Sequence, residues 1–315
     1  MKVTTNIEGK ISSLLDTAYN LFQEGDFLKS IEVLEEALSL EFDHAEVVFA
    51  LKCANFWDDK KKKWESKERN KESGEYFIIQ WKNFILFLDR IENDFESTTY
   101  PIRQWVFKNA LSELKETDNG KVHHEGRYYF LLGRCYKGIG NYENALEYFE
   151  TANHQKADDP EILAELADCY ALIGEVKAAK VFFREAFFLN PQKVDIHFLE
   201  SMLILRLISK VKASGYLSPE LEEWIPIYGT VFGVLNVKRE LKPLEHVRLK
   251  QEVLSMESEL SRETEKSPFF VPRLLNRYFW LIDHYVSSKE DKIKIEEIFE
   301  KIRKIDPNLY DLYVH

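Results

Sequence analysis

Two segments of the sequence resemble each other at a spacing of 34 residues, and this repetition constrains the fold more than any other feature. They are GRCYKGIGNYENALEYFETA, residues 133–152, and ADCYALIGEVKAAKVFFREA, residues 167–186. Aligned without a gap, they share the same residue at Cys135/Cys169, Tyr136/Tyr170, Ile139/Ile173, Gly140/Gly174, Ala145/Ala179, Phe149/Phe183 and Ala152/Ala186. This period is that of a helix-turn-helix repeat.

The glycines Gly133, Gly138 and Gly140 raise the question of a phosphate-binding loop. Such a loop follows a buried strand and is usually followed by Lys and Ser or Thr, which contact the phosphate and its metal ion. The preceding RYYFLL could form a strand, but the apolar residues after it keep a helical spacing and no Gly-Lys-Ser/Thr follows. We therefore interpret these glycines as packing and turn residues.

The repeated segments resemble the tetratricopeptide repeat family. The second segment carries the family pattern throughout, at Leu163, Leu166, Ala167, Tyr170, Gly174, Ala179, Phe183, Ala186 and Pro191. In this interpretation small residues let the two helices of a hairpin approach, aromatic residues fill the space between hairpins, and Gly140 and Gly174 end the first helices.

The same pattern recurs near both ends of the chain. The N-terminal unit has Leu14, Ala18, Leu21, Gly25, Phe27, Ser30, Leu34, Ala37 and Leu40 at equivalent positions, with Phe42 where Pro is expected. The C-terminal unit fits more loosely, with Phe279, Ile282, Val286, Phe299, Ile302, Ile305 and Pro307, and with Asp283 and Ile295 replacing small residues.

The expected fold is all-α: a tetratricopeptide-type solenoid of helical hairpins with an irregular helical insert and a divergent C-terminal helical region. We expect an N-terminal hairpin and the start of a degenerate second repeat in 1–57, a charged loop and helical insert in 58–121, two regular repeats in 122–192, divergent helices in 193–267 and a degenerate hairpin in 268–315. Periodicity predicts helices at 8–23, 27–40, 44–57, 73–94, 100–116, 122–138, 142–155, 160–173, 176–189, 193–213, 218–236, 243–265, 268–287 and 289–304.

The charged segment 58–74 interrupts the second repeat, and we interpret it as a solvated loop or helix extension. A docking site for an acidic partner is the alternative. The insert that follows is expected to supply an oversized second helix for repeat two. Pro226 and Gly229 predict a kink or break near Ile225. The helix from Lys242 to Glu265 has a narrow apolar stripe, and it either covers the edge of the solenoid or packs on another protein.

Composition restricts the class of protein. The 315 residues are 45% hydrophobic and 14% aromatic, which suits a largely helical chain with a continuous core. The formal net charge of -11 disfavours nucleic acid as the main ligand. Three cysteines without metal-type clustering indicate a reducing compartment. The N-terminus has no apolar signal region and Met202–Ile208 is too short to span a bilayer, so we expect a cytoplasmic protein.

No catalytic or metal-binding constellation is recognisable. The adjacent pair His123 and His124 diverges too far on one element to act as paired metal ligands, and no nucleophile elbow or metalloprotease helix occurs. We therefore expect no cofactor, no metal and no enzymatic activity. An enzyme built from dispersed residues remains an alternative.

The resemblance implies that first helices line a concave side on which a partner binds. The expected partner-binding residues are Tyr19, Phe22, Phe49, Phe56, Phe130, Arg134, Lys137, Glu161 and Asp168. An aromatic N-terminal part and a charged middle part suit a peptide or helix with an apolar anchor and polar flanks. In an equal alternative, residues 73–116 fill the aromatic part themselves.

The sequence thus favours a non-enzymatic scaffold or adaptor that binds a protein segment in its groove, with no nucleic acid and no direct membrane insertion, while self-association stays open. The alternative is a regulatory sensor that changes conformation on binding a short peptide or small ligand.

Overall fold

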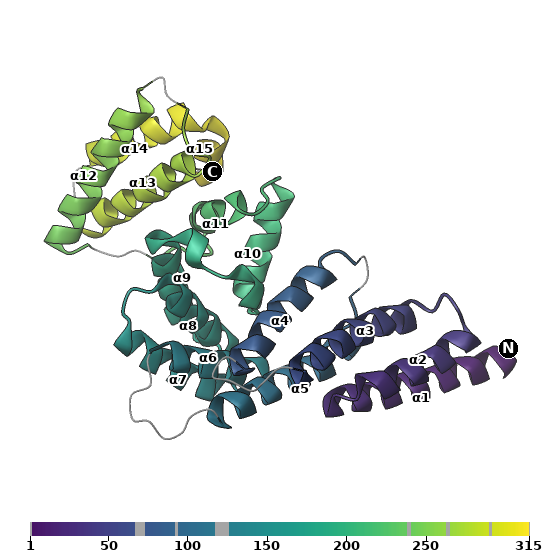
Figure 1. Cartoon of the computed structure of the whole chain (residues 1–315). Coiled ribbons are helices and arrows are strands. Elements are labelled where there is room, and N and C mark those ends of the chain that lie inside the picture. Colours follow the sequence, from purple (N-terminus) through teal and green to yellow (C-terminus); the bar gives the residue numbers. More distant parts are fainter. Residues whose placement is uncertain are drawn as a thin grey trace. The chain divides into compact units, whose positions relative to one another are not determined.

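The computed structural model describes residues 2–66, 73–91, 94–116, 126–237, 241–262, 265–289 and 292–314. These residues form fifteen α-helices, two short 3₁₀ helices and no strand (Figure 1). The all-helical fold predicted from the sequence is therefore confirmed. The chain divides into two compact units, Met1–Ala152 and Asn153–His315.

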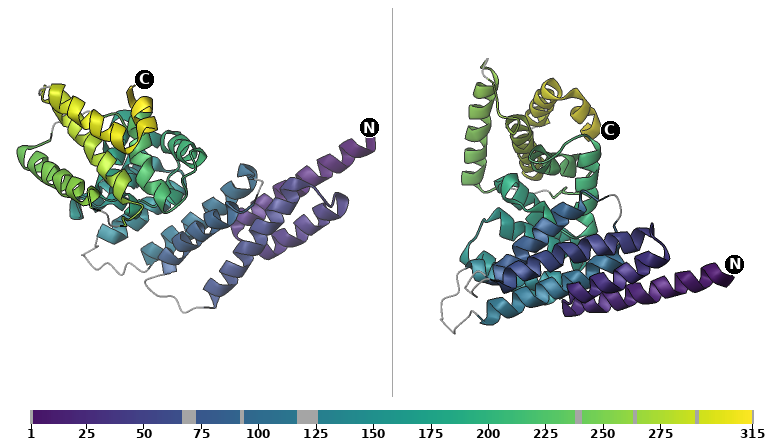
Figure 2. Two further views of the ribbon diagram at one scale, coloured as in Figure 1. Left: turned by 90° about the horizontal axis from the view of Figure 1, so that it is seen from above. Right: turned by 45° about the vertical axis from the view of Figure 1, so that its right-hand side comes forward.

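The helices of the first unit are α1 (Lys2–Glu24), α2 (Phe27–Leu40), α3 (Ala45–Glu65), α4 (Ser73–Leu88), α5 (Glu96–Glu116), α6 (Gly126–Gly138) and α7 (Tyr142–Gln155), which ends just beyond the unit. The helices α1 and α2 form a hairpin and lie side by side (Figure 2). The hairpin turns at Gly25, whose φ of 76° strains residues with a side chain, and Asp26 caps α2 by accepting the Lys29 N–H.

The turns predicted at Gly140 and Gly174 are confirmed, since both glycines have a positive φ, 83° and 89°. Gly133 is a packing residue, because a Cβ atom there would lie 2.6 Å from the ring of Phe149 on α7. The hairpin of α6 and α7 is further closed by Tyr136 and Tyr148, which stack with their ring centroids 5.1 Å apart.

The core of the first unit is a group of buried rings, which we call the aromatic cluster, from α2, α3, α4 and α5. It consists of Phe27, Trp57, Phe77, Trp81, Phe84, Trp105 and Phe107. Edge-on contacts dominate, as between Phe27 and Trp105 at 4.9 Å and between Trp57 and Trp105 at 6.0 Å. Four helices are thus joined by one continuous set of rings.

The helix α3 continues to Glu65, beyond its predicted end at residue 57. Its lysines are held by the helix itself, because Lys62 pairs with Asp58 at 2.6 Å and Lys63 pairs with Asp59 at 2.7 Å. The charged segment is therefore a helix extension as far as Glu65, while its residues 67–72 lie outside the described part. These local ion pairs give no support to the alternative of a docking site for an acidic partner.

The helix α4 does not pair with α3 as the second helix of a repeat. It packs along α5, which in turn packs on α1, and reaches α3 through ring contacts such as Trp57–Phe84 at 5.4 Å. The expected role of this segment as the second helix of repeat two is therefore wrong. Its aromatic residues, which made it look buried on several faces, belong to the aromatic cluster instead.

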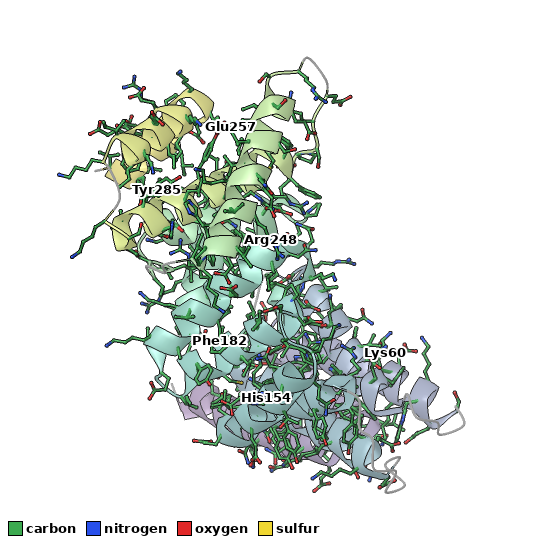
Figure 3. All side chains as sticks on the ribbon, turned by 90° about the vertical axis from the view of Figure 1, so that its left-hand side faces the viewer. Lys60, His154, Phe182, Arg248, Glu257 and Tyr285 are labelled. Atoms are coloured by element: carbon green, nitrogen blue, oxygen red, sulfur yellow. The ribbon has the colours of Figure 1, made fainter. Side chains whose placement is uncertain are left out.

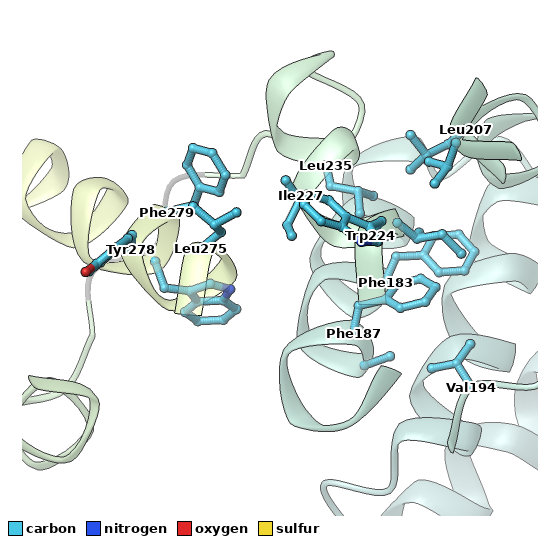
Figure 4. Packing of buried hydrophobic residues seen from close by; sticks show 14 of the residues in the cluster. Phe183, Phe187, Val194, Leu207, Trp224, Ile227, Leu235, Leu275, Tyr278 and Phe279 are labelled. Atoms are coloured by element: carbon cyan, nitrogen blue, oxygen red, sulfur yellow. The ribbon is translucent and has the colours of Figure 1, made fainter. Parts of the chain in front are cut away.

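The helices of the second unit are α8 (Pro160–Leu172), α9 (Val176–Leu189), α10 (Met202–Ala213), α11 (Glu220–Val231), α12 (Pro243–Leu260), α13 (Phe270–Ser287), α14 (Lys292–Ile305) and α15 (Pro307–Val314), with 3₁₀ helices at Pro191–Lys193 and Ile196–Phe198. In its core, Phe183 and Phe187 of α9 lie against the face of α11 that carries Trp224 and Ile227 (Figure 4). Polar contacts connect α11 and α13, where Arg273 donates to the buried Glu223 at 3.1 Å.

Three helix predictions for this unit are corrected. The helix predicted at 193–213 begins at Met202, and the residues before it form 3₁₀ turns. Of the kink or break predicted near Ile225, the break does not occur, because α11 runs through Pro226. The final helix α15 was not predicted, because the C-terminal repeat pattern ends at Pro307. In the structure Pro307 is the first residue of α15.

The helix α12 packs on α13 with one face only. Leu249 and Val253 are buried there, and the Tyr278 hydroxyl donates to Glu257 at 2.8 Å (Glu257 is labelled in Figure 3). Leu244 and Leu254 of the same helix are exposed. The helix covers α13, in the manner of a cap, while its outer side stays open to solvent.

The three cysteines, Cys53, Cys135 and Cys169, are thiols, not disulfides, and are buried. Burial raises the pKa of the Cys53 and Cys135 thiols, so the reactive thiolate is scarcer at any pH. We therefore expect a disulfide reagent such as DTNB at pH 8 to label the folded chain at least about 100-fold more slowly than free cysteine. In urea all three thiols should react and release three equivalents of the coloured thiolate of DTNB per chain. Fast labelling of the folded chain would contradict the burial of the thiols.

Candidate functional site

Six of the nine predicted partner-binding residues are buried: Phe22, Phe49, Phe130, Arg134, Lys137 and Asp168. Tyr19, Phe56 and Glu161 are partly exposed.

The aromatic part of the predicted groove is covered by the insert. The Tyr19 hydroxyl donates to Glu46 at 2.7 Å and lies 3.0 Å from the Thr98 hydroxyl on α5, and burial raises its pKa. The ring of Phe49 lies 5.5 Å from that of Phe95, and the ring of Phe56 stacks on Phe87 of α4 at 5.1 Å. Residues of the segment 73–116 therefore contact the aromatic part of the predicted groove, as the alternative interpretation expected. The binding of a partner by Tyr19, Phe49 and Phe56 stays a prediction.

The charged residues of the middle part also have internal contacts. In the first unit the Arg134 guanidinium lies over the ring of Phe130, 4.4 Å from its centroid. In the second unit the Asp168 carboxylate accepts the backbone N–H groups of Glu200 and Ser201 at 2.8 and 2.9 Å. These bonds fix the chain just before α10, so Asp168 has a structural task that its position on a first helix did not reveal.

An open groove lies elsewhere on the first unit, along α3. It has a volume of about 530 Å³ and is lined by Leu38, Val48, Leu51, Lys52, Asn55, Phe56 and Phe87, which we call the α3 groove. Five residues of α3 line it at the spacing of a single helical face, with Leu38 of α2 on one side and Phe87 of α4 on the other. Its five apolar side chains are all partly exposed. Among the described residues that line it, Lys52 is the one that carries a charge.

Comparison with known proteins adds one finding on the family. Residues 139–199 match the sequence profile of the tetratricopeptide repeat. This stretch is similar to the tetratricopeptide repeat family. None of the curated proteins compared with it matches. Tetratricopeptide repeats are generally modules of protein interaction.

The tetratricopeptide pattern explains why the α3 groove is open. One position of the repeat is occupied by Ala18, Lys52, Gly133 and Ala167 on the four first helices. Ala18 and Lys52 are 34 residues apart, and so are Gly133 and Ala167. Ala18, Gly133 and Ala167 are small, so that a second helix can approach, as the ring of Phe149 does at Gly133. At this position α3 carries the long, exposed side chain of Lys52, and no helix of its own repeat covers that face in the described part of the chain. Lys52 at this repeat position is a signal visible in the sequence alone.

A second pocket, of about 430 Å³, lies in the second unit between α9, α12 and α13. Phe188 and Trp280 form part of its lining, with ring centroids 4.1 Å apart. Two of its four acids are used within the fold, since Glu252 pairs with Arg277 at 2.8 Å and Glu245 accepts the Lys242 N–H at 2.8 Å. Because no set of groups in it points to one ligand, the α3 groove is the better candidate.

Over the described ranges of the chain, no group of three His, Cys, Asp or Glu side chains is placed to hold a metal ion. The predicted surface pair His123 and His124 lies outside these ranges. A search of the same ranges finds no helix with the length and apolar character needed to span a membrane.

Proposed function

We propose that this chain is a scaffold or adaptor that binds an apolar segment of a partner protein in the α3 groove. The observation that carries the proposal is the groove itself, in which Leu38, Val48, Leu51, Phe56 and Phe87 stand together with partly exposed side chains. Contiguous exposed apolar patches are uncommon on proteins without partners. The stacked pair Phe56 and Phe87 would give such a segment a rigid aromatic surface.

The proposal includes a reducing compartment, the cytoplasm, as the place of action. It is supported by the three buried cysteines, which are thiols and not disulfides. The proposal is non-enzymatic, because a binding surface of this kind acts through shape and contact.

A peptide selection tests the proposal without a known partner. A displayed library of random 16-residue peptides is selected on the full chain, and the recovered peptides are then measured on two variants. Leu51→Asp places a charge in the α3 groove, and Leu28→Asp makes the same change at an exposed leucine of α2 outside it. We expect Leu51→Asp to weaken binding about 30-fold, the effect of losing a contact of about 2 kcal/mol.

The control variant Leu28→Asp should bind the peptides as the unchanged chain does, and both variants should show the same helical content by circular dichroism. If the recovered peptides bind the Leu51→Asp variant as tightly as the original, the α3 groove is not the binding surface and the proposal is wrong.

A further inference from the structure

Resting on the proposed function, we infer that the occupant of the α3 groove is an α-helix of a partner protein, which takes the position of the missing second helix and presents a carboxylate to Lys52. The partner would complete a tetratricopeptide hairpin from outside the chain.

The first observation is that the α3 groove is lined by the residues that face the second helix in the complete hairpins. On α6, Tyr129, Gly133 and Tyr136 all contact α7: both tyrosines stack on Tyr148, at 6.4 and 5.1 Å, and Gly133 lies against Phe149. On α8, Tyr170 stacks on Phe182 of α9 at 5.4 Å. The α3 residues at the same repeat positions are Val48, Lys52 and Asn55. All three line the α3 groove, so this groove is a helix-binding face without its helix.

The second observation concerns the chain's own helices. The helix that follows α3 in sequence is α4, and it packs along α5. Its residue Phe87 stacks on Phe56 and forms one wall of the groove, and Leu38 of α2 forms another. The face between these walls stays open, and the helices α7 and α9, which fill it in the complete hairpins, have 14 residues each. A partner helix of that length would extend over about 21 Å at 1.5 Å per residue.

The third observation is the charge of the groove. The small residues Ala18, Gly133 and Ala167 leave room for direct helix contact, whereas the Lys52 ammonium would lie against the incoming helix. Lys52 is exposed and makes no ion pair with any side chain in the described part of the first unit. A carboxylate on the partner would neutralise it in a partly desolvated contact, where a charge-assisted hydrogen bond is strong. The expected partner is therefore an amphipathic helix with apolar residues spaced by three or four and one Asp or Glu among them.

The peptides selected on the full chain provide the test. Those that depend on Leu51 should carry apolar residues at helical spacing with an acidic residue between them, and proline in the middle should abolish binding. Lys52→Glu should weaken their binding at least tenfold, and replacing the acidic residue of the peptide with lysine should restore it. Lys108→Glu, at an exposed lysine of α5 outside the groove, is the matched control and should change binding less than twofold.

The outcomes separate this inference from the proposed function. If Leu51-dependent peptides have no helical spacing, tolerate proline or ignore the charge at residue 52, the groove binds an extended segment and the helix inference is overturned while the proposed function stands. If no Leu51-dependent peptide is recovered, both are overturned. Restoration by the charge exchange would be hard to explain by misfolding of the Lys52→Glu variant, because an unfolded chain would bind neither peptide.

Discussion

Replacement of Trp57 with alanine is expected to lower the free energy of unfolding of the first unit by about 3–5 kcal/mol, the usual cost of deleting a buried tryptophan. Trp57 is 1% exposed and stands at the centre of the aromatic cluster. It contacts Phe27 on α2, Trp81 and Phe84 on α4, and Trp105 on α5. Its loss would leave a cavity where four helices meet, which the remaining rings cannot close without leaving their edge-on geometry.

Hydrogen exchange followed by mass spectrometry measures this loss for each helix. Amides of α2, α3 and α5 should exchange faster in the Trp57→Ala variant, since they share the core that is weakened. Trp64→Ala on the same helix is the matched control, because Trp64 is partly exposed and its removal should cost only about 1 kcal/mol. Equal effects of the two replacements would show that the aromatic cluster is not the core of this unit.

The second large effect is expected from Arg184→Met, which removes one partner of a buried ion pair in the second unit. Arg184 of α9 pairs with Asp283 of α13, and both side chains are less than one-tenth exposed. Arg184 also donates to the backbone oxygen of Val237 at 2.6 Å and lies over the ring of Trp280. Because Asp283 would remain as an unpaired buried charge, we expect the free energy of unfolding to fall by about 3–5 kcal/mol.

Urea unfolding monitored by circular dichroism gives the size of this effect. Arg277→Met, which breaks the pair with the exposed Glu252, is the matched control and should cost less than about 1 kcal/mol. A double variant, Arg184→Met with Asp283→Leu, should recover part of the loss, because it no longer buries an unpaired carboxylate. A single Arg184→Met variant as stable as the original chain would contradict the buried pair.

Much of the fold could be predicted from the sequence where local signals agree. The helices α7 and α9 match their predicted bounds, because a positive-φ glycine precedes each and the apolar spacing inside each is regular. The same agreement fails after α3. Nothing in residues 73–88 shows that their rings pack with Trp105 instead of closing a hairpin on α3, because this choice depends on contacts between distant segments.

The candidate site was less accessible to prediction. Position on a first helix does not tell whether a charged side chain faces a partner or the chain's own backbone, as Asp168 does when it accepts two N–H groups from residues 32 and 33 positions later. The α3 groove, in contrast, had a visible sign in Lys52, a long residue where the other first helices carry Ala or Gly. A departure from a repeat pattern was thus more informative about the binding surface than agreement with it.

The aromatic cluster has an optical consequence. The indole rings of Trp81 and Trp105 lie 6.5 and 6.0 Å from that of Trp57, close enough for excitation energy to pass among the three before a photon is emitted. Because the planes of Trp57 and Trp105 differ by 75°, each transfer rotates the direction of polarisation. The intrinsic fluorescence of this group should therefore be strongly depolarised even in a rigid chain. A rise in anisotropy would then report, without any attached dye, that the three indoles have moved apart.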